Sequence, residues 1–260
     1  MSDKPYGLFC PIAKACEVLE PRWTMPILAE MSCGTSRFNE LRRGMPRISP
    51  SLLSKRLKEM EEQGLVERII DKGSGTVDYV RTPRAVELHP ILVALGHWAQ
   101  RNIEAESALC DRDPATLMWL LRRKVDADEL PPTRIVILFH FTDVPKKTSR
   151  YWLVAKPGVA VDLCLSDPGF TVDLYIDTQV PILTGILFGR CSLSLELEQE
   201  RLRLIGAPRL SRTIDKWLRL SYFAPSASLA QTGEPAEKSR FTDKTPKDGL
   251  MRLRVDWGDT

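Results

Sequence analysis

The feature that most constrains the fold is a basic helix whose two ends are marked in the sequence. Ser49 can accept a hydrogen bond from a free backbone amide of the first turn, and Pro50 suits the first helical position. Gly64 can adopt the left-handed conformation that ends a helix. Between these ends, apolar residues recur at helical spacing and predict one buried stripe, with polar and basic residues on the opposite side. The stripe contains Leu53, Leu57 and Met60, and the outer side contains Ser51, Lys55 and Lys58.

Positive charge is concentrated around this helix. The whole chain carries a formal net charge of only +3, but from residue 37 to residue 58 seven basic residues stand against Glu40 alone. A helix that enters the DNA major groove needs an apolar side held by a small core, and first turns that present polar and basic side chains to bases and phosphates. The alternative is an amphipathic surface helix with a solvated basic face. The segments on either side favour the first interpretation.

Short helices precede the basic helix. Apolar spacing predicts helices over residues 12–19 and 23–31. Asn39 predicts the N-cap of a third helix over residues 40–43, after a very short strand at residues 36–38. Together with the basic helix, these elements predict a helix-turn-helix.

A hairpin and a long helix follow. Two strand-like runs, residues 65–70 and 77–82, are joined by a glycine-containing turn. This layout is typical of a winged helix, with Lys72 and Ser74 at a tip that can reach phosphate or the minor groove. A long helix is predicted over residues 86–103, and its apolar stripe is wider than a small domain can cover. The surplus predicts a dimer contact.

The order of these motifs resembles the HxlR family of bacterial transcription regulators, which are dimeric winged-helix proteins. The resemblance spans roughly residues 10–104 and implies a sequence-specific DNA-binding homodimer. It is carried by Cys10-Pro11-Ile12-Ala13, Arg22-Trp23-Thr24, Arg37 to Leu41, Ile48-Ser49 through Leu53, Arg56-Leu57, Glu61, Gly64-Leu65-Val66, Asp78-Tyr79, Thr82-Pro83, Glu87-Leu88, Leu95 and Trp98.

Two groups of site residues are predicted in this half of the chain. Ser51, Ser54 and Lys55 are expected nearest the bases, and Lys58 is among those expected nearer the phosphates. The full set predicted to contact DNA is Arg37, Arg43, Ser49, Ser51, Ser54, Lys55, Lys58, Lys72 and Ser74. The set predicted at the dimer interface is Ile12, Leu19, Leu88, Leu92, Leu95 and Trp98.

The remainder of the chain predicts a second domain. A length of 260 residues, with 43% apolar and 27% charged residues, fits two domains of about 100–150 residues each. The polar, proline-containing run Asp111-Arg112-Asp113-Pro114 places the boundary near Cys110, so the domains are predicted at residues 1–110 and 111–224. Strand-like runs and helices then predict an α+β domain with a mostly antiparallel sheet. Strands are expected at residues 134–141, 151–155, 159–165, 170–176 and 201–205, and helices at 117–121, 181–188, 193–199 and 208–220.

The apolar pattern of residues 117–223, with Gly189 and Gly206, resembles the sterol-carrier-protein fold, a lipid-binding module. The runs that carry it are Val172 to Ile176, Ile182 to Gly189 and Arg201 to Gly206. The resemblance implies an apolar small-molecule effector. The helices carry more apolar residues than one sheet face requires, which predicts a pocket, and the alternative is a solid core. The predicted pocket residues are Leu117, Leu120, Leu183, Leu187, Phe188 and Trp217.

The two ends of the chain differ from the segments between them. Residues 225–260 are rich in Pro, Ser, Thr, Gly and charge and predict a flexible tail, within which residues 251–257 alternate as a terminal strand would. The N-terminus lacks the apolar core of a signal peptide, and the apolar runs are too short to span a bilayer. We therefore expect a cytoplasmic protein without membrane insertion.

Catalytic and metal motifs are not recognisable. The three histidines, His89, His97 and His140, accompany neither a nucleophile nor paired carboxylates, so no enzyme activity is predicted. The six cysteines include no C-x-x-C pair, and neither a metal, a cofactor nor a disulfide framework is predicted. Cys10 precedes the first helix, where the helix dipole and Lys14 can favour a thiolate.

The resemblance gives Cys10 a candidate role. Some relatives in the HxlR family sense oxidants or electrophiles through a cysteine near this position. The alternative is a small residue buried at the dimer contact.

Two functions of different classes remain. The first is a DNA-binding repressor or activator whose second domain binds an apolar effector. The second is a lipid- or acyl-ligand carrier whose winged helix serves dimerisation or protein contact. The basic run from Arg37 to Lys58 favours the first function, because a helix that contacts only protein has no need of a face whose charges are nearly all positive.

Overall fold

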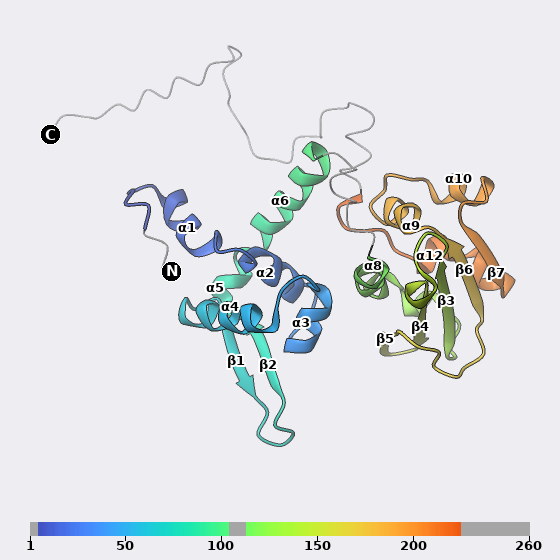
Figure 1. Ribbon diagram of the computed structural model, residues 1–260, viewed down its shortest axis with the longest axis horizontal. Coiled ribbons are helices and arrows are strands. Elements are labelled where there is room, and N and C mark those ends of the chain that lie inside the picture. Colours follow the sequence, from blue (N-terminus) through green and yellow to red (C-terminus); the bar gives the residue numbers. More distant parts are fainter. Residues whose placement is uncertain (1–4, 104–112, 225–260) are drawn as a thin grey trace, which may run out of the picture.

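The computed structural model describes residues 5–103 and 113–224, here called the N-terminal unit and the C-terminal unit (Figure 1). The predicted boundary near Cys110, the tail and its terminal strand lie outside the described residues. In the two described ranges, no helix is long and apolar enough to cross a membrane.

The N-terminal unit has the predicted winged helix-turn-helix layout. Helices α2, α3 and α4 share one hydrophobic core, and the two-stranded β1–β2 ribbon projects from beside α4 (Figure 1). The elements are α1 (Pro11–Leu19), α2 (Thr24–Ser32), α3 (Phe38–Gly44), α4 (Pro50–Glu62), β1 (Val66–Ile70), β2 (Val77–Arg81), α5 (Pro83–Val86) and α6 (His89–Asn102).

Helix α4 begins, ends and faces the core as the sequence predicts. The Leu52 amide donates a hydrogen bond to Ser49 Oγ at 3.2 Å, and Pro50 is the first helical residue. Gly64 follows the helix with a φ of 69°, a conformation that costs glycine little. The buried residues of α4 are Leu53, Leu57 and Met60.

The prediction that Asn39 caps α3 is wrong. The helix begins at Phe38, with Arg37 in an extended conformation at the N-cap. Arg37 is held extended because it forms an isolated β-bridge with Asp78 of the wing. The predicted strand at residues 36–38 is reduced to that single bridge.

The predicted single helix over residues 86–103 is divided into α5 and α6. Pro90 explains the break, because proline has no amide proton to donate to the Val86 carbonyl and its ring would clash with that carbonyl. Helix α5 therefore ends at Val86, and α6 begins at His89 with Pro90 in its first turn.

The C-terminal unit is an α+β domain with a five-stranded sheet of order β5-β4-β3-β6-β7. Three of the four strand pairs are antiparallel and β3 pairs with β6 in parallel, which confirms the mostly antiparallel prediction. The strands are β3 (Ile135–Phe141), β4 (Arg150–Lys156), β5 (Val159–Cys164), β6 (Leu174–Thr178) and β7 (Arg203–Gly206). The helices are α8 (Pro114–Leu121), η1 (Arg122–Lys124), η2 (Ala127–Glu129), η3 (Lys146–Thr148), α9 (Val180–Leu187), α10 (Leu193–Glu198), α11 (Pro208–Arg212) and α12 (Ile214–Trp217).

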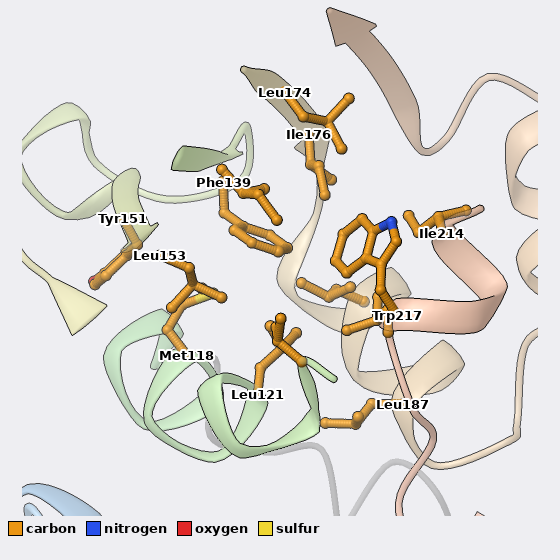
Figure 2. Close-up of a cluster of buried hydrophobic side chains, with 14 of the residues drawn as sticks. Met118, Leu121, Phe139, Tyr151, Leu153, Leu174, Ile176, Leu187, Ile214 and Trp217 are labelled. Carbon is orange, nitrogen blue, oxygen red and sulfur yellow. The ribbon is translucent and has the colours of Figure 1, made fainter. Parts of the chain in front are cut away.

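The predicted ligand-pocket residues lie in the main core of this unit. Side chains of α8, α9 and α12 pack against one face of the sheet around Phe139 and Trp217, both fully buried (Figure 2). Trp217 Nε1 donates to the Leu210 carbonyl at 2.9 Å, so the indole is satisfied inside the core. Leu117, Leu183, Leu187 and Trp217 belong to this core, and Leu120 and Phe188 pack against it. Neither described cavity is lined by any of the six.

Two further boundaries differ from the prediction. Strand β6 begins at Leu174 and not at residue 170. The residue before it, Asp173, bonds to the start of β3 through its side chain, because its carboxylate accepts a hydrogen bond from the Val136 amide at 2.8 Å. The predicted helix over residues 208–220 splits at Thr213, which sits between α11 and α12.

A largely buried carboxylate, with 13% of its side chain exposed, joins the two units. Glu30 of α2 accepts hydrogen bonds from Trp119 Nε1 at 2.9 Å, from Arg123 at 2.5 and 3.2 Å, and from Thr35 Oγ1 at 2.9 Å. Burial raises the pKa of Glu30, but the hydrogen bonds from Arg123, Trp119 and Thr35 and the charge of Arg123 outweigh it, so the pKa is lowered. A Cβ at position 44 would lie 2.5 Å from the Glu30 carboxyl carbon, so any larger residue there would displace the Glu30 side chain.

A second contact joins the C-terminal unit to α6. The Phe223 ring lies against Gly96 and meets the His97 ring edge-on at a centroid distance of 5.3 Å. Arg190 Nη2 donates to Gln100 Oε1 at 2.9 Å one turn further along the helix. The C-terminal unit thus contacts both α2 and α6 of the N-terminal unit.

Gly96→Ala tests the Phe223 contact. Alanine in a helix interior is favoured over glycine by about 1 kcal/mol, but a Cβ at Gly96 would lie 2.4 Å from a ring atom of Phe223. We expect Gly96→Ala to stabilise the protein by about 1 kcal/mol only in a Phe223→Ala background. Urea unfolding of the four proteins measures this coupling, and an equal gain in both backgrounds would show that Phe223 does not rest on Gly96.

Candidate nucleic-acid interface

The outer face of α4 is polar, basic and exposed. Ser49, Ser51, Ser54, Lys55 and Lys58 are all exposed, while the opposite side of the helix is anchored in the core. The hydroxyls of Ser49 and Ser51 lie 3.2 Å apart at the helix N-terminus, where free backbone amides favour an anion such as phosphate. The first turns of α4 therefore present the groups that the sequence predicts at a DNA surface.

The two lysines of this face pair with carboxylates of the next turn. Lys55 Nζ lies 3.8 Å from Glu59, and Lys58 Nζ lies 3.8 Å from Glu62. Lys58 has 78% of its side chain exposed. Exposed pairs of this kind contribute about 0–1 kcal/mol, so a phosphate can replace either carboxylate at little cost.

Arg56 differs from these lysines. Its side chain is only 14% exposed and lies 2.5 Å from Glu59. It is held against the protein and does not belong to the exposed face.

The wing presents Lys72 at an ordered turn. The Asp71 carboxylate accepts from the Gly73 amide at 2.8 Å and from Ser74 Oγ at 2.7 Å. The hydrogen bonds from Ser74 and Gly73 lower the pKa of Asp71. Ser74 also lies 2.7 Å from Thr76, so its hydroxyl already holds the turn, and Lys72 is exposed beside it.

Two arginines that were predicted to contact phosphates lie beside other groups of the protein. Arg37 is 3.8 Å from Asp78 at the base of the wing. The Arg43 guanidinium lies 5.8 Å from the Trp119 ring centroid and lines a cavity between the two units. The structure therefore brings together the α4 residues of the predicted set, and it places Arg43 against the C-terminal unit.

Helices α1 and α6 have no buried residue, although both carry apolar side chains. Ile12 is 73% exposed, Leu95 45% and Trp98 55%. Leu19, Leu88 and Leu92, the other predicted interface residues, pack against the core of the N-terminal unit. Half of the predicted interface set is therefore free for a further contact.

Cys10 occupies the N-cap position of α1 and is exposed. Lys14 forms hydrogen bonds to both carboxylate oxygens of Glu17 at 3.1 Å. The thiol is accessible, and its role as a sensor stays a prediction.

The sequence did not indicate the cluster of Glu30, Trp119, Arg122 and Arg123. These residues come from α2 and from the α8–η1 segment, about ninety positions apart in the chain. No local motif connects them. In the described ranges, no three His, Cys, Asp or Glu side chains gather as metal ligands would.

Comparison with known proteins matches the N-terminal part of the chain. Residues 18–107 match the HxlR-like helix-turn-helix family. The uncharacterised HTH-type transcriptional regulator YvaP of Bacillus subtilis (strain 168) is 35% identical over 97 residues, which cover 36% of this chain and 90% of YvaP. The HTH-type transcriptional regulator YodB of the same organism is 29% identical over 106 residues, which cover 40% of this chain and 95% of YodB. The structure of reduced YodB from B. subtilis aligns with a TM-score of 0.34 and 30% identity, covering 37% of this chain and 97% of that one.

Proposed function

This chain belongs to the HxlR family of HTH-type transcriptional regulators, and from that premise we propose that it is a dimeric, sequence-specific DNA-binding regulator that reads DNA through α4. The observation that carries the proposal is the division of α4. Leu53, Leu57 and Met60 anchor one side, and Ser51, Ser54, Lys55 and Lys58 are exposed on the other. A helix anchored and exposed in this way fits the major groove, with the wing placed to reach the adjacent backbone.

Dimerisation is supported by the uncovered apolar side chains of α1 and α6. Ile12, Leu95 and Trp98 are exposed, and Ile91 of α6 is 52% exposed. A twofold contact through these helices would cover them and present two copies of α4. Two recognition helices about 34–36 Å apart match successive major grooves on one side of DNA.

Control by an effector is the proposed role of the C-terminal unit. Its resemblance to sterol carriers supports an apolar small molecule, and its contacts at Glu30 and Gly96 give it a physical connection to α2 and α6. A ligand changes DNA affinity only by its different affinities for the competent and incompetent arrangements of the protein. These two contacts are where such a difference would be transmitted.

The alternatives are a ligand carrier and a thiol sensor. A carrier whose winged helix only contacts protein would have no sequence preference on DNA. A thiol sensor has in its favour the exposed Cys10 at the start of α1. Oxidant-dependent DNA binding that is lost in Cys10→Ser would favour sensing.

Genome-wide recovery of DNA bound to the full chain tests the main proposal. We expect a pair of related half-sites, because the dimer is symmetric. Ser51→Ala should change the preference at one base-pair position of each half-site by about 1–3 kcal/mol while leaving the other positions unchanged. Recovery of DNA without a shared sequence, or an unchanged preference in Ser51→Ala and Ser54→Ala, would contradict readout through α4.

A further inference from the structure

A cavity of about 820 Å³ lies between the two units. The turn after α2 and helix α3 form one wall, and η1 and the edge strand β5 form the other. Its volume is in the range of sites that hold small organic ligands. It lies away from the core residues in which the sequence predicted a pocket, because none of those residues lines it.

One part of the lining is apolar. Val161 and Leu163 of β5 contribute to it, together with Phe170 from the loop before β6. Phe170 is 41% exposed, with its ring held by the Arg134 guanidinium 4.0 Å from the ring centroid. An apolar ligand body can cover these side chains and gain the free energy of removing them from water.

The other part of the lining is cationic. It contains two carboxylates, Glu40 and Asp162, and four cations, Arg43, Arg122, Arg123 and Lys156. Arg123 is already paired with Glu30, which leaves the remaining cations in excess.

Arg122 lies at the centre of this cationic part. Its guanidinium is stacked 3.3 Å from the Trp119 ring centroid and donates to the Trp119 carbonyl at 2.8 Å. Among the described residues, neither Arg122 nor Arg43 forms a salt bridge with a carboxylate. Burial and the charge of Arg123 lower the pKa of Arg122 to about 10, although Glu30 and Glu40 act in the opposite direction. An anion beside this guanidinium would relieve that repulsion.

We propose that this cavity binds a small amphipathic anion, with its carboxylate on Arg122 and Arg43 and its apolar body against Val161, Leu163 and Phe170. Arginine suits the charged end, because its planar fork can donate two hydrogen bonds to one carboxylate. The ligand touches both units, since Arg43 belongs to α3 and Arg122 to η1. Its binding therefore strengthens the docking of the C-terminal unit beside the helix-turn-helix.

The regulatory consequence rests on the proposed function. A ligand that fixes α3 against η1 changes how freely α3 and α4 adjust on DNA, so DNA affinity and ligand affinity are reciprocally linked. The binding site itself does not depend on DNA, and the two claims are tested separately.

Isothermal titration of the full chain with sodium decanoate and sodium 2-naphthoate tests the site. We expect at least one of the two probes to bind saturably, with one molecule per chain. The alcohol with the same carbon skeleton should bind at least about 10-fold more weakly. Arg122→Gln and the exposed Arg43→Gln should each weaken carboxylate binding about 10-fold, whereas Arg209→Gln on the exposed surface of α11 should have no effect.

The proposal would be overturned by no saturable binding of either carboxylate, by equal affinity for acid and alcohol, or by unchanged affinity in both arginine variants. Inorganic phosphate binding as tightly as the carboxylates would also overturn it, because the apolar wall would then contribute nothing. Fluorescence anisotropy of labelled DNA with and without the bound probe tests regulation, and a protein without specific DNA binding would fail only this second measurement.

Discussion

Trp98→Glu is expected to convert the protein from dimer to monomer. The indole is 55% exposed on α6 beside Leu95 and near no described covering element, and in the proposed dimer it becomes buried. Twofold symmetry places two such side chains in one interface. Even one unpaired carboxylate buried there costs about 4 kcal/mol and the dimer would bury two, so the dimer dissociation constant should rise at least about 1,000-fold. Affinity for a DNA with two half-sites should fall with it, because each half-site alone is bound weakly.

Sedimentation equilibrium over a wide concentration range measures the effect. Ile205→Glu is the matched control, because Ile205 is also an exposed apolar residue, 55% accessible, but lies on β7 in the C-terminal unit. The control is expected to sediment as the unchanged dimer. An unchanged dimer for Trp98→Glu would remove α6 from the interface.

Glu30→Ala is expected to weaken the docking of the two units by about 3 kcal/mol. The carboxylate has 13% of its side chain exposed, and its removal leaves the Trp119 indole N–H without its acceptor and the Arg123 guanidinium with Thr35 alone. Urea unfolding and amide exchange in α8 and η1 report the loss. Glu62→Ala is the control. The Glu62 side chain is 64% exposed, so its ion pair with Lys58 should contribute less than about 1 kcal/mol. Equal losses in the two variants would mean that Glu30 does not hold the units together.

The same carboxylate makes docking sensitive to acid. Because the folded pKa of Glu30 is lowered from 4.5, its contribution to stability is fully present above pH 4.5 and is lost as pH falls through the folded value. The protection of α8 amides from exchange, relative to their intrinsic rate at each pH, should therefore decrease below pH 4.5 in the natural protein. Glu30→Ala should show faster exchange in α8 already at neutral pH. In this variant, lowering the pH should cause no additional loss of protection through position 30.

Local patterns predicted the elements that depend on local chemistry. Ser49 and Gly64 mark the ends of α4 because capping is decided within one turn, and the continuous apolar run of β3 follows from burial on both faces of a sheet. The break between α5 and α6 was also determined locally by Pro90, but the apolar stripe that continues across it favoured one long helix.

Other features depend on contacts between distant segments. Arg43 lies in the same basic run as Lys55 and Lys58, but its position is decided by Trp119, which comes from another unit. The apolar helices of the C-terminal unit were equally consistent with a pocket and with a packed core, because apolar composition is the same in both. Only the packing around Trp217 and Phe139 distinguishes them (Figure 2).

The dependence of DNA affinity on salt, compared between the natural protein and Lys55→Ala/Lys58→Ala, tests readout through α4 most directly. The dimer loses two Lys58 phosphate contacts, so the slope of log affinity against log salt should flatten by about 2, and operator affinity should fall at least about 10-fold. Lys146→Ala/Lys147→Ala, which removes two exposed lysines of η3, should change neither quantity. If Lys55→Ala/Lys58→Ala leaves both the affinity and the slope unchanged, α4 is not the DNA-reading helix.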